Sequence, residues 1–130
     1  MKHTTILLLL LVLLAAGCAR ASSEPPDDGL TISLAYEPDP AVMGEATLLV
    51  TVCDAAGQPV KDATINVKGD MNHAGMVPVL AGATAGPGGV YELPFRWTKS
   101  GSWIVTVDVT LADGAAASRR FDVSVSLPDS

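Results

Sequence analysis

Hydrophobic and polar residues alternate with a period of two along most of the chain after residue 29. The alternating stretches are rich in valine, isoleucine, threonine and aromatic residues, and turn residues separate them. The clearest are residues 30–36, 46–53, 63–69, 90–97, 102–111 and 118–127. None of these stretches has a helical period. Six or seven short strands in a domain of about 100 residues predict an all-β, immunoglobulin-like antiparallel β-sandwich.

The alternation also predicts which side chains form the core. Two strands carry aromatic residues on the inward face, Tyr91 to Trp97 and Trp103 to Leu111, and we expect both tryptophans to anchor the core. Pro94 interrupts its strand and indicates an edge position or a bulge. The segment DAAGQPV, residues 54–60, is expected to close an antiparallel hairpin, which would place Met43 opposite Asn72.

The first 17 residues have the pattern of a secretory signal peptide, with a basic start at Lys2 and an apolar run too short to span a bilayer. The run Ala15-Ala16-Gly17 directly before Cys18 resembles the bacterial lipobox, which implies that Cys18 becomes the lipidated first residue of the mature chain. The alternative is an ordinary cysteine near a cleavage site. Residues 18–29 are small, acidic and proline-containing, which indicates a flexible stalk before one domain over residues 30–127.

Charge limits the partners that the mature chain could have. The signal peptide contains Lys2 and no acid, so its removal changes the formal net charge from −6 to −7. An acidic protein is a poor partner for nucleic acid and for anionic lipid. An acyl group on Cys18 would instead hold it to the lipid bilayer. We therefore expect an exported protein, on the outer membrane facing the periplasm or on the outer face of the cytoplasmic membrane.

With Cys18 acylated, Cys53 would be the single cysteine of the domain. We expect it to be a small buried residue at the end of a strand, in a domain stabilised by packing alone.

One segment, GDMNHAGMVPV at residues 69–79, departs from the strand pattern. Met71 and Met76 lie within three residues of His73, the one histidine that follows the signal peptide. Thioether and imidazole groups suit Cu(I), whereas zinc would prefer thiolate or carboxylate beside the histidine. The predicted hairpin would add Met43 as a candidate fourth ligand and would keep Cys53 roughly 20 Å away.

A structural interpretation fits the same segment. Continued alternation would turn Met71 and His73 toward the core, where Met71 and Met76 would fill gaps and His73 would bond to a carbonyl. The sequence leaves both interpretations open.

Patterns that indicate catalysis are absent from the sequence. It has no Gly-x-Ser-x-Gly elbow and no second group of metal ligands. The run GPGG, residues 86–89, lacks the strand and helix context of a phosphate-binding loop and indicates a turn. We expect no enzymatic activity.

Two motifs and the segment between them resemble the YtkA-like and FixH-like group of bacterial envelope domains, from about Gly44 to Val109. The motifs are LLVTVCDAAGQPVKDATINVKG and GGVYELPFRWTKSGSWIVTVDV. The resemblance implies a small β-sandwich that is tethered at a membrane or fused to larger envelope proteins. Some members of the group are associated with copper handling or with maturation of haem-copper oxidases, and no enzymatic activity is agreed for it. FixH proteins carry a transmembrane helix, whereas this chain has a lipobox-like sequence.

Two functions follow as expectations. The first is a non-catalytic, membrane-anchored envelope lipoprotein that binds copper as Cu(I) through Met71, His73 and Met76, with Met43 as a candidate fourth ligand. The alternative is a metal-free protein-interaction or structural module of an envelope complex. In a sandwich of this topology, Met43, the Met71–Met76 loop and the turn from Trp97 to Trp103 would gather at the end opposite the start of the first strand.

Overall fold

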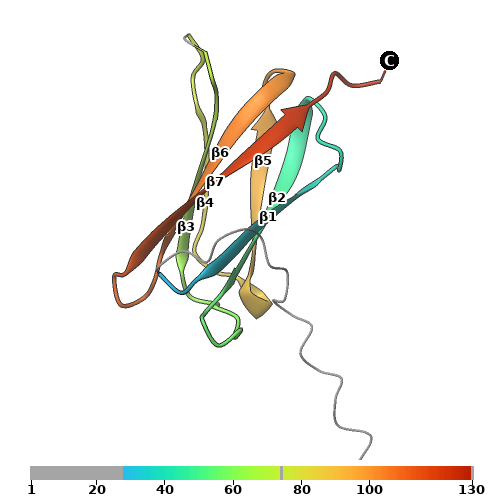
Figure 1. Cartoon of the computed structure of the whole chain (residues 1–130). Helices are drawn as coiled ribbons and strands as arrows, with labels where there is room; N and C mark the ends of the chain where they lie inside the picture. Colours follow the sequence, from blue (N-terminus) through green and yellow to red (C-terminus); the bar gives the residue numbers. More distant parts are fainter. Residues whose placement is uncertain (1–27, 74, 130) are drawn as a thin grey trace, which may run out of the picture.

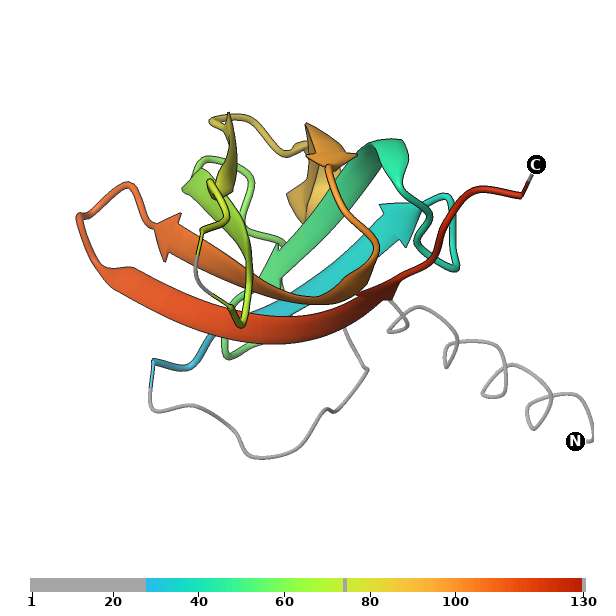
Figure 2. The same ribbon diagram turned by 90° about the horizontal axis from the view of Figure 1, so that it is seen from above.

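The computed structural model describes residues 28–73 and 75–129, and these form seven strands in two antiparallel sheets. A three-stranded sheet has the order β1-β2-β5 and a four-stranded sheet the order β4-β3-β6-β7 (Figures 1 and 2). The strands are β1 Thr31–Glu37, β2 Gly44–Cys53, β3 Thr64–Met71, β4 Val79–Ala83, β5 Val90–Trp97, β6 Gly101–Thr110 and β7 Ala116–Val125. The predicted immunoglobulin-like sandwich is confirmed.

Six of the strands coincide with the predicted stretches to within about two residues at most ends, as expected for boundaries inferred from a pattern. The seventh, β4, has the sequence VLAGA, in which small residues and Gly82 leave little alternation to detect. Pro94 lies on β5, which is an edge strand as predicted. The run GPGG lies in a short turn that contains the 3₁₀ helix η1 Pro87–Gly89.

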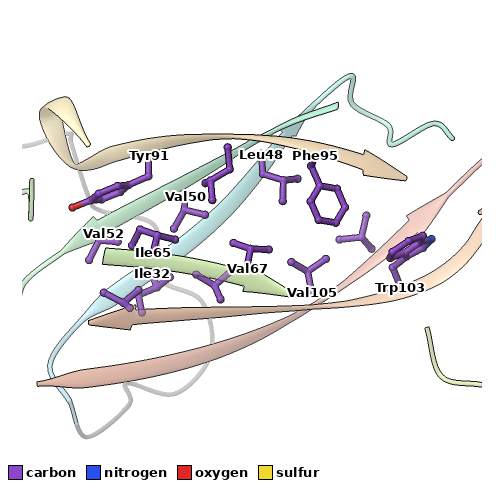
Figure 3. Close-up of a cluster of buried hydrophobic side chains, with 14 of the residues drawn as sticks. Ile32, Leu48, Val50, Val52, Ile65, Val67, Tyr91, Phe95, Trp103 and Val105 are labelled. Carbon is purple, nitrogen blue, oxygen red and sulfur yellow. The ribbon is translucent and has the colours of Figure 1, made fainter. Parts of the chain in front are cut away.

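The core lies between the two sheets and contains the side chains that the alternation turns inward (Figure 3). Both tryptophans are buried, which confirms their predicted role as core anchors. Trp97 lies 5.2 Å from Trp103 and 4.8 Å from Phe95 between ring centroids, in edge-to-face arrangements. Tyr36 packs edge-to-face on Trp97 at 6.2 Å. We call these four residues the aromatic cluster.

The predicted hairpin between β2 and β3 is wrong. Strand β2 pairs with β1 and β5, whereas β3 pairs with β4 and β6, so the two strands belong to opposite sheets. The segment between them starts as a tight turn, in which the Asp54 carboxylate accepts bonds from the backbone N–H groups of Ala56 and Gln58. A bridge between Cys53 and Pro59 follows, and the chain then crosses to the other sheet. Because both strands have an apolar face, they bury more surface face to face than edge to edge.

Tyr91 fixes this crossover. Its buried hydroxyl donates a hydrogen bond to the Val60 carbonyl at 2.7 Å and accepts one from the Ala63 N–H at 3.0 Å. A Cβ atom on Gly86 would come within 2.6 Å of the Tyr91 ring, so a glycine is required beside it. The hydroxyl thus ties the start of β5 to the connection between β2 and β3.

Arg119 attaches the beginning of the domain to β7. Its guanidinium donates bonds to both carboxylate oxygens of Asp28, at 2.7 and 2.9 Å, and to the Leu30 carbonyl at 2.9 Å. The hydrogen bonds from Arg119 lower the pKa of the Asp28 carboxyl. We call this contact the entry clamp because the chain enters the sandwich here.

Cys53 lies at the same end as the entry clamp, since its register partner is Thr31. It is buried at the end of β2, as predicted. The expectation that it stays unpaired is wrong, because Cys53 is disulfide-bonded and carries no free thiol.

The predicted signal peptide, Cys18 and all but the last two residues of the predicted stalk lie outside the described residues. Within the part of the chain that the structure describes, no helix is long and apolar enough to cross a membrane.

Candidate functional site at the β3–β4 hairpin

Three segments that are distant in sequence meet at one end of the sandwich. Strand β5 ends at Trp97, whose partner is Gly44 at the start of β2. Strand β3 ends at Met71, whose partner is Trp103 near the start of β6. The predicted gathering of Met43, the Met–His loop and the turn after Trp97 is therefore confirmed. In Figure 1 the β3–β4 hairpin projects beyond the other strands, at the end of the sandwich opposite the start of β1.

Met71 packs against the end of the core. It continues the inward positions of β3, is half-buried and contacts the hydrophobic core cluster. Its Cε atom lies over Gly101, where a Cβ atom would come within 2.8 Å of it. The Met71 N–H donates to the Asp70 carboxylate at 2.8 Å, which fixes the backbone where the strand ends. The inward direction predicted for Met71 is correct.

Met76 and His73 differ in exposure. Met76 is half-buried and packs against the same core cluster, whereas His73 is exposed. The prediction that His73 faces the core is wrong, because the β3–β4 ladder stops at the pair Gly69–Val79 and β3 ends two residues before the histidine. The loop of the β3–β4 hairpin thus has a half-buried thioether on each side, Met71 and Met76, and an exposed imidazole between them, His73.

Met43 is placed elsewhere on the same end of the molecule. It is 37% exposed, and its N–H donates to the carbonyl of Ser126, just after β7, at 2.8 Å. Strands β7 and β6 therefore lie between Met43 and β3, which corresponds to roughly 14 Å along the sheet at about 4.8 Å per strand. The hairpin that placed Met43 opposite Asn72 does not form, so strand pairing gives no support for Met43 as a fourth ligand.

Two features of this hairpin are not apparent from the alternation. Val77 and Leu80 are 82% and 73% exposed, although both are large apolar residues. Consecutive apolar residues in the sequence VPVLA were the available signal, but they suit a buried strand equally well. The other feature is the contact of Met71 with Gly101, the first residue of β6. This contact depends on the pairing of β3 with β6.

Carboxylates do not assemble into a second candidate site. A hollow of about 550 Å³ on the outer face of the three-stranded sheet is bordered by Glu37, Glu45 and Glu92. Glu45 pairs there with Arg96 at 3.4 Å, and both side chains are largely exposed. Among the described residues, no three His, Cys, Asp or Glu side chains form a group that could hold a metal ion.

Comparison with protein families gives a match to the YtkA-like model over residues 25–108, which is more than half of the chain. The chain belongs to the YtkA-like family. A search of the curated proteins gives no match. Among solved structures, the chain is similar to the PmoD soluble domain from Methylocystis sp. ATCC 49242 (Rockwell), at 14% identity and a TM-score of 0.49, covering 78% of this chain and 94% of that one. It is also similar to murine CRIg, at 10% identity and a TM-score of 0.41, covering 77% and 98% of the two chains.

Most motif residues of this YtkA-like domain have structural roles. Asp54 forms the turn after β2, Tyr91 fixes the crossover, and Trp103 belongs to the aromatic cluster. The exposed part of the β3–β4 hairpin has no comparable role in the core. It is therefore the part of the YtkA-like domain whose residue types call for a functional explanation.

Proposed function

We propose that this YtkA-like domain is a non-catalytic module of the cell envelope that binds Cu(I) through Met71, His73 and Met76. The supporting observation is that two thioethers and an imidazole occur within six residues of a hairpin that projects from the sandwich (Figure 1). These are the ligand types that a soft monovalent copper ion prefers.

The packing of the two methionines would assist binding. Met71 and Met76 both rest against the core cluster but keep part of their surface accessible. Each side chain has therefore already lost part of its rotational freedom, which reduces the entropy lost when a metal binds. His73 would complete the site from the exposed side. Met43 is a candidate only if the segment before β2 moves, because its N–H is bonded to Ser126.

A Cu(I) titration against a chromophoric chelator tests this function. We expect one Cu(I) per chain, at least tenfold weaker binding in Met71→Leu, and loss of the site in His73→Ala, because each substitution removes one soft ligand. Leucine preserves the volume of methionine, so the fold should be kept. Met43→Leu is the matched control and should bind like the wild type. If the wild type and all three variants compete equally poorly with the chelator for Cu(I), the copper site does not exist.

A metal-free interaction module is the second candidate, and the exposure of Val77 and Leu80 favours it. Apolar side chains that stay exposed on a projecting hairpin are typical of surfaces that meet a protein partner. A folded protein that binds no Cu(I) would make this alternative the better one. The partner would then be another envelope protein that contacts the same hairpin.

We also propose that the mature chain is attached to the bilayer through acylated Cys18, a proposal supported by the lipobox-like sequence alone. Mass spectrometry of the protein purified from membranes should show the lipid mass on an N-terminal peptide that begins at Cys18. Cys18→Ser should release the protein in soluble form. The disulfide at Cys53 stands against this proposal, because the chain has two cysteines and an acylated Cys18 cannot pair with Cys53. A Cys18–Cys53 disulfide in the purified wild type would contradict the proposal.

A further inference from the structure

The outward face of the four-stranded sheet carries two neighbouring rows of opposite charge. Strand register defines the rows, because directly paired residues lie side by side on one face. In one row an isoleucine lies between two acids, and in the next row a threonine lies between two bases. These rows are Asp70–Ile104–Asp122 and Lys68–Thr106–Arg120. We call the six residues the charged face.

Ion pairs between described residues do not neutralise the charges of this face. Among the described residues, ion pairs join Arg96 to Glu45 and Arg119 to Asp28, and neither pair involves the charged face. Lys68, Arg120 and Asp122 are exposed. The centre of the face is less polar, because Ile104 and Thr106 are half-buried and Leu80 lies beside Lys68 at 73% exposure.

We propose that the charged face binds the same face of a second copy of this chain, with the strands of the two copies antiparallel. A two-fold axis that runs along the rows, midway between them, places each row over the other row of the second copy. Each strand then lies over its own equivalent. Asp70 meets Lys68 of the second copy, Asp122 meets Arg120 of the second copy, and the central Ile104 meets Thr106. Symmetry repeats each contact, giving four pairs of opposite charge.

The other face-to-face arrangement is disfavoured by the same charges. A two-fold axis along β6 would keep the strands parallel and would place β3 over β7 of the second copy. Asp70 would then oppose Asp122, and Lys68 would oppose Arg120. Like charges brought together across an interface are repulsive, so the charge pattern selects the antiparallel arrangement. The alternation of sign also disfavours a partner of one charge, such as a nucleic acid.

The size of the face predicts a weak dimer. The charged face and one flanking row of outward residues on each side of it make four rows about 6.6 Å apart on three strands about 4.8 Å apart, which cover on the order of 300 Å² per copy. Stable complexes bury about 800 Å² per partner. We therefore expect a dissociation constant between about 10 µM and 1 mM that rises with salt, since exposed charges are screened.

Charge reversal on β7 tests the proposal with the exported chain, residues 18–130. On the outward face of this strand, Arg120→Asp leaves two acids and Asp122→Arg leaves two bases, so each variant alone should be repelled by its own copy. Mixed together, the two variants restore opposite charges at both positions. In sedimentation equilibrium we expect a dimer for the wild type, at least tenfold weaker association for each variant, and a heterodimer for the mixture.

Neither side chain makes an ion pair with the described residues, so both variants should unfold at the same denaturant concentration as the wild type. Recovery in the mixture would show that the single variants are folded and that the contact is face to face. A wild type that stays monomeric at 1 mM in low salt would overturn the proposal. So would variants that self-associate as strongly as the wild type. Copper binding at the hairpin plays no part in either result.

Discussion

Replacing Trp103 by alanine is expected to lower the free energy of unfolding by about 3–5 kcal/mol, the usual range for a large aromatic residue in a core. Trp103 is 1% exposed and packs edge-to-face on Trp97 and on Phe95, at 5.2 and 6.3 Å between ring centroids. Its Nε1–H donates to the Lys99 carbonyl at 2.9 Å, which fixes the turn between β5 and β6. Urea denaturation followed by circular dichroism measures the effect.

Phenylalanine substitutions separate the packing from the hydrogen bond. Trp103→Phe keeps an aromatic ring but leaves the Lys99 carbonyl without its donor. Trp97→Phe loses no such bond, because Nε1 of the buried Trp97 has no partner among the described residues. Trp103→Phe should therefore cost about 1 kcal/mol more than Trp97→Phe. If the Trp103→Ala variant lost less than about 1 kcal/mol, Trp103 would not anchor the core.

Gly69→Ala is expected to lower the free energy of unfolding by about 1–3 kcal/mol through overpacking. A Cβ atom at this buried position of β3 would lie 2.5 Å from Cζ of Phe95 and 3.3 Å from two ring atoms of Trp103. The aromatic cluster packs directly on the backbone here, so one methyl group forces the rings to move. Urea denaturation again provides the measurement.

Gly82→Ala on β4 is the matched control for this substitution. Gly82 is exposed, and the closest approach of its Cβ atom would be 3.3 Å to the Ile65 carbonyl. Alanine there should lower stability less than at Gly69, because 3.3 Å is a tight contact whereas 2.5 Å is an overlap. Equal effects at the two positions would mean that the aromatic cluster rearranges without cost.

Strand positions and inward faces could be predicted because the period of two is a local property of each segment. Pairing could not be predicted in the same way. The strands ending at Cys53 and beginning at Thr64 each have one apolar face, which suits either a hairpin or two packed sheets. The residues from Asp54 to Val60 form a tight turn in either case. Only the packing of the whole core decides between the two arrangements.

In the candidate site, too, the local strand pattern could be predicted and the contacts between strands could not. Met71 faces the core as the alternation requires, because it is still part of β3. His73 lies beyond the end of the ladder, where alternation no longer determines direction. Placing Met43 in the site depends on a β2–β3 hairpin, which does not form. The gathering of the loops at one end survived that error, because successive strands reverse direction whichever sheet they join.

The positions of the entry clamp and the β3–β4 hairpin at opposite ends determine how far from an anchor the hairpin could act. A ten-residue strand such as β2 is about 33 Å long. Residues 18–27 can span at most about 35 Å. With Cys18 in the bilayer, the hairpin could search a hemisphere of roughly 70 Å radius around the attachment point. Molecules well beyond the lipid headgroups would thus lie within its reach.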